Sequence, residues 1–256
     1  MLEYVDYNEK NEKILTQIGG INADMLMDIT VKKLLKGQKA VVQEEQKEAA
    51  ILLLSGTLSL QFAGKTEEMR RRNPFDERPY CLHCAKQTVV EIEALEDSEF
   101  ILQKTDNDKT FEPVFYSPAD CRYEEAGQEQ WDGAAHREIV TVFDLDNAPY
   151  SNMVLGEVIN RPGRWSSYPP HHHPQPEVYY YLFDRPQGFG ACFVGDEVFK
   201  IEDGSVALIS GGNCHQQVTA PSYKMYYCWM IRHLPNDPWD KTRIYDEAHT
   251  WMLSER

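Results

Sequence analysis

The chain has 256 residues, of which 42% are hydrophobic, enough for one large domain or two domains of ordinary size. With 41 acidic and 26 basic residues, the formal net charge is −15, and such a surface repels phosphate backbones, which argues against a nucleic-acid partner. No apolar run approaches the roughly 20 residues that span a bilayer, and the polar start MLEYVDYNEKNEK is unlike a secretory signal, so we expect a cytoplasmic protein without a membrane partner.

Short apolar segments separated by turn residues recur through most of the chain. Strand-like segments are predicted at residues 51–62, 80–85, 88–95, 99–104, 138–145, 154–159, 177–183, 191–195, 197–201, 205–210 and 224–231. The first of these contains a Ser-Gly pair, which predicts a turn within it. Many short strands with frequent turns are typical of an all-β sandwich or barrel, and helical turns are expected only within 23–36 and 239–251.

Six cysteines are spread along the chain, and only Cys81 and Cys84 lie close together in sequence. The sequence CLHC has the spacing of half a zinc knuckle, but the second cysteine pair of a structural zinc site is missing. We therefore expect reduced cysteines with a structural role. Tyr80, Leu82 and Cys84 are predicted to share one face of a short strand.

A polar, acidic stretch with two glycines divides the chain into halves of similar β-rich character. We predict a first domain at 1–122, a linker at 123–137 and a second domain at 138–256. Six of the eight histidines follow the linker, namely His171, His172, His173, His215, His233 and His249. The chemistry of the protein is therefore expected in the second domain.

The sequence HHHPQPE contains the strongest candidate for a metal site. In a strand, His171 and His173 project to one face while His172 points away. Pro174 and Pro176 end that strand, and an antiparallel return would bring Glu177 beside the two histidines. The alternative is a surface histidine cluster with no relation to any other histidine.

A later histidine completes a possible ligand set. The segment GSVALISGGNCH places Gly204, Gly212 and His215 around an apolar strand and a glycine turn. Three imidazoles and one carboxylate suit one divalent ion such as zinc, manganese, iron or nickel. Four protein ligands with positions left for water or substrate are typical of a catalytic site.

These two motifs resemble those of the cupins, small double-sheet barrels, with Ser210 where the second motif usually has proline. The flanking segments WSSYPPH, EVYYYLFDRPQGFG and VTAPSYKMYY resemble the 5-deoxy-glucuronate isomerase family of inositol catabolism, whose wider kin include 5-keto-4-deoxyuronate isomerase. The resemblance implies an all-β bicupin, with two double-stranded β-helix (jelly-roll) barrels. It also implies that the first barrel lacks metal ligands and that the second binds metal through His171, His173, Glu177 and His215.

The same resemblance implies a reaction and a substrate. The reaction is aldose–ketose isomerisation of a small sugar acid, 5-deoxy-glucuronate, to 2-deoxy-5-keto-gluconate. The expected catalytic residues are Glu177, Tyr179 and Tyr181, because the two tyrosines share the face of Glu177 and either is a candidate base. Their alternative role is that of aromatic core residues.

The substrate carboxylate requires a cation. The candidates are Arg164, with Arg161 close to it in sequence, and Lys224, with Arg232 on the same late strand, and Trp165 is expected to shape the pocket. Because bicupins often pair through exposed strand edges, a homo-oligomer is expected. Two other functions stay open. One is a cupin dioxygenase, and the other is a metal-free sugar-sensing or scaffold protein.

Overall fold

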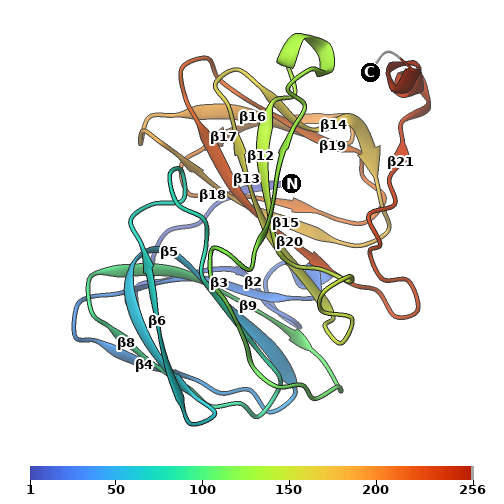
Figure 1. Cartoon of the computed structure of the whole chain (residues 1–256). Coiled ribbons are helices and arrows are strands. Elements are labelled where there is room, and N and C mark those ends of the chain that lie inside the picture. Colours follow the sequence, from blue (N-terminus) through green and yellow to red (C-terminus); the bar gives the residue numbers. More distant parts are fainter. Residues whose placement is uncertain (255–256) are drawn as a thin grey trace. The chain divides into compact units, whose positions relative to one another are not determined.

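The computed structural model describes residues 1–254, which divide into two compact units (Figure 1). Unit 1 contains Met1–Tyr4, Tyr123–Thr141 and the chain from Val154 onward, and unit 2 contains Val5–Arg122 and Val142–Met153. The domain boundaries inferred from the sequence stay a prediction. The segment predicted as a linker contributes most of β11 and all of η2 to unit 1.

The all-β character predicted from the sequence is confirmed. Across residues 1–254 the helical elements are three short 3₁₀ segments, η1 (Ala23–Met25), η2 (Gln130–Gly133) and η3 (Glu247–Ser254). No helix in this part of the chain is long and apolar enough to cross a bilayer. All six cysteines are free, as expected.

Unit 2 is built on a sheet with the strand order β10-β7-β5-β9-β3-β2, to which β6, β8 and β4 are joined through β5. Its strands are β2 (Glu12–Thr16), β3 (Asp28–Leu34), β4 (Lys39–Val42), β5 (Lys47–Phe62), β6 (Lys65–Arg71), β7 (Cys81–Cys84), β8 (Val90–Ala94), β9 (Ser98–Asp106) and β10 (Val114–Tyr116). Apolar side chains from these strands fill the interior, among them Leu58, Met69 and Phe100. Leu82 and Cys84 belong to this core and Tyr80 packs against it, as strand alternation predicted.

Strand β5 differs from the sequence prediction, because the Ser-Gly pair forms no turn. The register shifts between Leu53 and Ser55, and the strand then continues from β9 and β7 to pair with β6 and β8. Gly56 allows this bend. Its φ is +99°, and a Cβ there would lie 2.3 Å from Ser98 Oγ. One bulged strand therefore serves both parts of the sheet.

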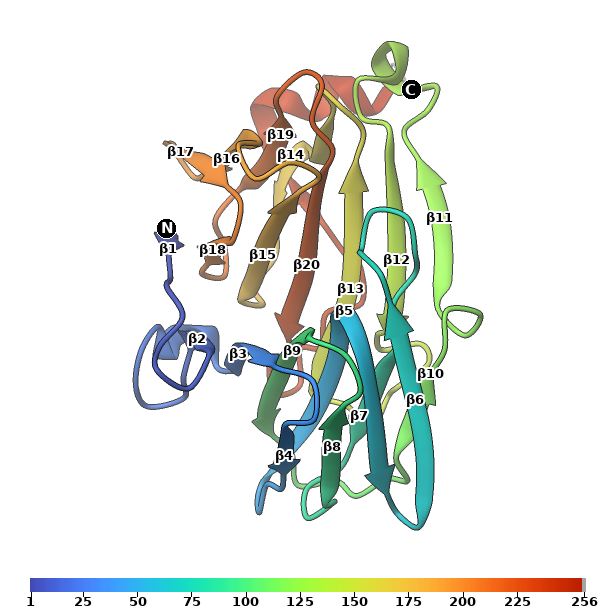
Figure 2. The same cartoon turned by 90° about the vertical axis from the view of Figure 1, so that its left-hand side faces the viewer.

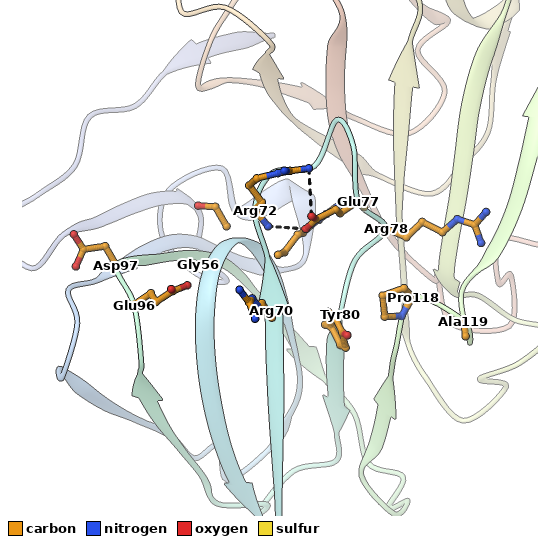
Figure 3. A pocket seen from close by; sticks show the side chains of 12 residues that line it. Gly56, Arg70, Arg72, Glu77, Arg78, Tyr80, Glu96, Asp97, Pro118 and Ala119 are labelled. Carbon is orange, nitrogen blue, oxygen red and sulfur yellow. Dashed lines mark hydrogen bonds and ion pairs between the residues drawn. The ribbon is translucent and has the colours of Figure 1, made fainter.

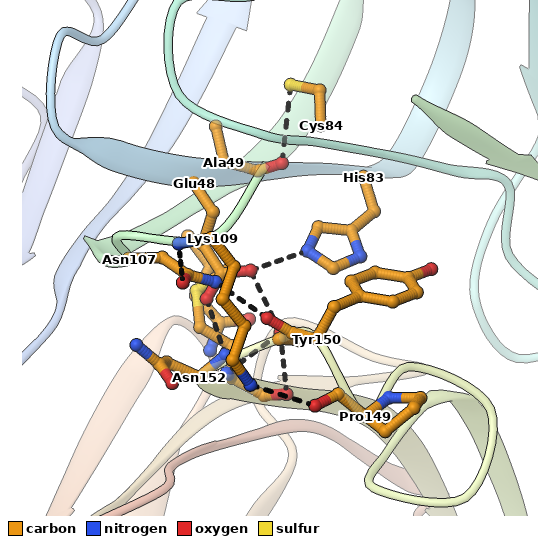
Figure 4. Close-up of polar contacts among 12 residues, drawn as sticks. Glu48, Ala49, His83, Cys84, Asn107, Lys109, Pro149, Tyr150 and Asn152 are labelled. Atoms are coloured by element: carbon orange, nitrogen blue, oxygen red, sulfur yellow. Dashed lines mark hydrogen bonds and ion pairs between the residues drawn. The ribbon is translucent and has the colours of Figure 1, made fainter. Parts of the chain in front are cut away.

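A buried polar cluster lies in unit 2 on the opposite face of β7 (Figure 4). His83 Nε2 lies 2.9 Å from Glu48 Oε2, and both side chains are fully buried. The Glu48 carboxylate also accepts hydrogen bonds from the Asn152 backbone N–H at 2.6 Å and from Ser151 Oγ at 3.0 Å. The His83 ring stacks on Phe143 with centroids 4.2 Å apart. Glu48 thus ties β5 to the 151–152 segment.

Unit 1 is built on two sheets, with strand orders β1-β18-β15-β20-β13-β12-β11 and β17-β16-β19-β14-β21. Figure 2 shows β15, β20, β13, β12 and β11 side by side. The strands are β1 (Leu2–Tyr4), β11 (Arg122–Ala126), β12 (Arg137–Phe143), β13 (Met153–Asn160), β14 (Trp165–His172), β15 (Glu177–Phe183), β16 (Phe189–Val194), β17 (Glu197–Glu202), β18 (Ser205–Ile209), β19 (His215–Thr219), β20 (Met225–Arg232) and β21 (Ile244–Tyr245). The core between the sheets is rich in aromatic side chains, including Tyr179, Tyr181, Tyr227 and Trp229.

Candidate metal centre

The first two histidines of the site lie at the end of β14 and directly after it. His171 and His173 are buried, whereas His172 is partly exposed, as the alternation of a strand predicted. His171 lies opposite His215, the first residue of β19, and the two rings have centroids 5.1 Å apart. Neighbouring strands of one sheet therefore supply all three imidazoles.

Glu177 reaches the histidines from the other sheet. Its Oε2 lies 3.3 Å from His173 Nε2 and 3.2 Å from His215 Nε2. Strand β15 pairs with β18 and β20, and not with β14, so the antiparallel return predicted from the sequence is wrong. The turn after His173 instead crosses from one sheet to the other, and the carboxylate meets the histidines across the interior.

Three of the four predicted ligands form one compact group. Candidate ligand atoms of His173, Glu177 and His215 all lie within 4.8 Å of one another, and all three residues are buried. Ligand atoms that share one first-row ion at about 2.0–2.2 Å lie about 3 Å apart, which matches the two Glu177 distances. His171 lies outside this group but beside it.

The protonation of the group favours a metal site. Burial raises the pKa of Glu177, but hydrogen bonds from His173 and His215 and their charges together lower it below its usual range. Burial, reinforced by the charge of His215, lowers the pKa of His171 to about 3. The site therefore presents an ionised carboxylate and, at His171, a neutral imidazole, the forms that bind metal.

Backbone carbonyls orient two of the rings. His171 Nδ1 lies 2.9 Å from Pro169 O, and His215 Nδ1 lies 3.1 Å from Asn213 O. A carbonyl only accepts, so each Nδ1 carries a proton and a neutral ring has its lone pair on Nε2. At His215, that Nε2 faces the Glu177 carboxylate, so the contact requires either a second proton or a cation. A divalent ion fits this arrangement of donors.

The two candidate tyrosines differ in their surroundings. The Tyr179 ring lies 5.9 Å from that of His215, and its hydroxyl lies 3.3 Å from Ser167 Oγ. Burial, followed by the charge of Glu177, raises the pKa of Tyr179 well above its usual value. The Tyr181 hydroxyl is instead buried without a hydrogen-bond partner, with Cys192 as its polar neighbour, and burial raises its pKa. Tyr179 is therefore the tyrosine at the cluster, and it is protonated.

The segment WSSYPPH forms an irregular stretch of β14 beside Tyr179. The β14–β19 register shifts between Ser166 and His171, so the intervening residues bulge out of the ladder. Within this bulge, Ser167 Oγ accepts a hydrogen bond from Gln217 Nε2 at 2.7 Å and contacts the Tyr179 hydroxyl. The bulge thus positions a polar network next to the candidate metal ligands.

The three predicted substrate-binding residues lie in different places. The Trp165 ring centroid lies 5.5 Å from that of Phe193. Cys192 and Val194 point into the core, so Phe193 between them points outward, and the Trp165 ring lies with it on the outer face of the sheet. Arg164 lies in the turn before β14. Lys224 precedes Met225, which pairs with Phe183, so it lies seven residues along the ladder from Glu177, or about 23 Å.

Three residues near the cluster were not predicted from the sequence. The Tyr245 ring lies 6.0 Å from that of His171, because β21 pairs with the end of β14. Arg243 and Arg137 are close enough for their charges to act on residues of the site. No local motif marks these residues, because long-range strand pairing brings them there.

A separate open pocket of about 1040 Å³ lies in unit 2 (Figure 3). Its lining mixes arginines with acidic residues, and Arg72 is paired with Glu77. Glu96 accepts a hydrogen bond from Thr57 Oγ1 at 2.6 Å, and Asp97 accepts one from the Lys36 N–H at 2.8 Å. Among the described residues, no group of potential metal ligands lies in this pocket, unlike the cluster in unit 1.

Comparisons with known proteins identify the family and the fold of the chain. The model of the KduI/IolB family matches residues 3–252. The chain is 26% identical to the 5-deoxy-glucuronate isomerase of Geobacillus thermodenitrificans, over 82% of this chain and 84% of that protein. It is 25% identical to the enzyme of the same name from Bacillus subtilis, over 94% and 93% of the two chains. The resemblance identified from the sequence is therefore confirmed.

Solved structures confirm the bicupin fold. The chain is similar to an IolB-like protein from Salmonella typhimurium, with a TM-score of 0.88 at 20% identity over 98% of both chains. It is also similar to the oxalate decarboxylase of Lactobacillus farciminis, with a TM-score of 0.70 at 12% identity over 100% and 92% of the two chains. At these identities the likeness establishes the fold alone.

Proposed function

Because the chain belongs to the KduI/IolB family, we propose that it is a metal-dependent aldose–ketose isomerase acting on a deoxy-uronic acid. The most favoured substrate is 5-deoxy-glucuronate, converted to 2-deoxy-5-keto-gluconate, because the similar proteins carry the name of that isomerase. The observation that carries the proposal is the buried group of His173, Glu177 and His215, with His171 beside it.

The reaction moves a proton between adjacent carbons. It also moves a proton from the hydroxyl oxygen on one of these carbons to the carbonyl oxygen on the other. A bound divalent ion would supply Lewis acidity at the carbonyl oxygen. His171, His173, Glu177 and His215 are the residues proposed to hold it. The protonated Tyr179 hydroxyl is suited to donate to a substrate oxygen, and Glu177 is the ionised group among the proposed catalytic residues.

The function is tested by measuring turnover of 5-deoxy-glucuronate by pure protein, stripped by a chelator and then reloaded with zinc, manganese, iron or nickel. We expect turnover that disappears with the metal and returns on reloading. Elemental analysis gives the metal content, and oxygen consumption by the iron form would indicate a dioxygenase instead. A fully loaded protein that converts no uronic-acid aldose would refute the isomerase proposal. Light scattering tests the proposed homo-oligomer.

Replacing Tyr179 with phenylalanine is expected to lower kcat by about 10²-fold or more, because the variant lacks the proton donor next to Glu177. Metal content should not change. Tyr181→Phe is the matched control, since its hydroxyl faces Cys192, and a much smaller effect is expected. Steady-state kinetics and elemental analysis on both variants provide the measurement. Wild-type kcat in Tyr179→Phe would remove this residue from the chemistry.

A further inference from the structure

We propose that Arg137 and Arg243 together bind the carboxylate of the substrate, and so select sugar acids over neutral sugars. This inference rests on the proposed function, since it assigns the carboxylate of the same substrate to a defined place. Neither arginine was among the cations predicted from the sequence. Both are brought to the site by strand pairing, and each contributes a guanidinium, the group best suited to a carboxylate.

Arg243 is placed by the short strand β21. This strand pairs antiparallel with the end of β14, with Tyr245 opposite His171 and Ile244 opposite His172. Arg243 directly precedes β21 and lies two residues before Tyr245, whose ring centroid is 6.0 Å from that of His171. The charge of Arg243 also acts on His171. Arg243 itself is exposed, as a residue at the entrance of a site would be.

Arg137 is placed at the start of β12. Two residues later on the same face, Ile139 packs against the aromatic core of unit 1, so Arg137 is directed to the interior side of the sheet. Its Nη1 donates to Ala135 O at 2.8 Å, which fixes part of the guanidinium. Its charge acts on Tyr227, and the charge of Arg243 acts on Arg137 in turn. The two arginines therefore approach the site from opposite sheets.

The charges of this pair are not balanced by a neighbouring carboxylate. Among the described residues, neither guanidinium forms a salt bridge, and Glu124 is the acidic residue whose charge acts on Arg137 from a distance. Burial lowers the pKa of Arg137, and repulsion from Arg243 lowers it further. Two cations whose charges act on each other in this way are stabilised when an anion binds between them. A carboxylate would relieve both the repulsion and the desolvation.

The chemistry of the substrate agrees with this placement. In an open-chain uronic acid, the carbonyl and the carboxylate lie at opposite ends of the molecule. The carbonyl end belongs at the histidine and glutamate cluster, so the carboxylate needs a cation beyond it. Arg243 adjoins the histidines, and Arg137 adjoins the tyrosines that line the same interior. Lys224 lies much further from Glu177 along the strands.

The test compares the binding of an acidic and a neutral sugar to the metal-loaded protein by calorimetry, using glucuronate and glucose. We expect Arg243→Gln and Arg137→Gln each to weaken glucuronate binding by about 10- to 100-fold, as expected for the loss of a hydrogen bond to a charged group. Glucose binding should not change. In steady-state assays with 5-deoxy-glucuronate the variants should raise KM far more than they lower kcat. Arg185→Gln, an exposed arginine in the turn after β15, is the matched control.

Each outcome decides one proposal. The carboxylate site is overturned if both variants bind glucuronate as tightly as wild type, or if they lose glucose binding to the same extent. It is also overturned if the wild-type protein prefers neither sugar. If Arg137→Gln fails to fold, Arg137→Lys and Arg243→Gln carry the test. Arg137→Lys should keep part of the preference for glucuronate over glucose, because lysine retains the positive charge but lacks the planar guanidinium that binds a carboxylate through two hydrogen bonds. Wild-type protein that binds glucuronate but never isomerises 5-deoxy-glucuronate refutes the isomerase alone.

Discussion

Replacement of Glu177 by glutamine is expected to give a folded protein that purifies without stoichiometric metal and has no measurable isomerase activity. Glu177 is the anionic member of the buried group, and its Oε2 faces His173 Nε2 and His215 Nε2 at once. An amide has the same shape but no negative charge to offset that of a divalent ion. Loss of a hydrogen-bond partner behind a ligand already costs about 10- to 100-fold in metal affinity, so loss of a ligand should cost more.

The measurement is elemental analysis of the purified variant, followed by titration with added metal and by kcat/KM. His172→Gln serves as the matched control, because His172 lies between two proposed ligands but is partly exposed and points to the other face. That variant should keep its metal and its activity. Full metal content and wild-type turnover in Glu177→Gln would show that the cluster is not the catalytic centre.

The grouping of the proposed metal ligands could be predicted because local rules determine most of their placement. Strand alternation places His171 and His173 together, and the glycine turn delivers His215 to the start of β19. The sheet that contains Glu177 could not be predicted. After His173 the chain can turn back within one sheet or cross to the other, and the pairing of β15 with β18 and β20 decides between the two. The ligand set was therefore predicted with the wrong local geometry.

Arg137, Arg243 and Tyr245 illustrate what sequence reasoning missed. Arg243 lies about 70 positions from His171 along the chain, and only the pairing of β21 with β14 brings the two together. Sequence proximity favoured Arg164, which lies in the turn before the bulge. In β5, the Ser-Gly pair favoured a turn in the sequence analysis. Gly56 has a positive φ, and a residue with positive φ is found in bulges as well as in turns. Local composition does not distinguish these alternatives.

Unit 2 contains the residue whose loss should destabilise the protein most, Glu48. Its fully buried carboxylate accepts the Asn152 N–H, contacts His83 Nε2 and accepts from Ser151 Oγ (Figure 4). In Glu48→Ala the Ser151 hydroxyl can still donate to Met153 O, but the Asn152 N–H and the His83 ring lose their partner in a dry interior. We expect the free energy of unfolding to fall by about 2–6 kcal/mol, because each of these two buried donors, left without an acceptor, costs about 1–3 kcal/mol.

Glu48→Gln should cost less than half as much, because its carbonyl oxygen can still accept from Asn152 while its amide can donate to His83. That exchange requires the ring proton of His83 to move to Nδ1, which has no hydrogen-bond partner in the present arrangement. Urea unfolding followed by circular dichroism measures both variants, and Glu45→Ala, an exposed neighbour, should stay within about 0.5 kcal/mol of wild type. Equal losses for alanine and glutamine would mean that His83 cannot change tautomer, and that the carboxylate itself is required to hold β5 to the 151–152 segment.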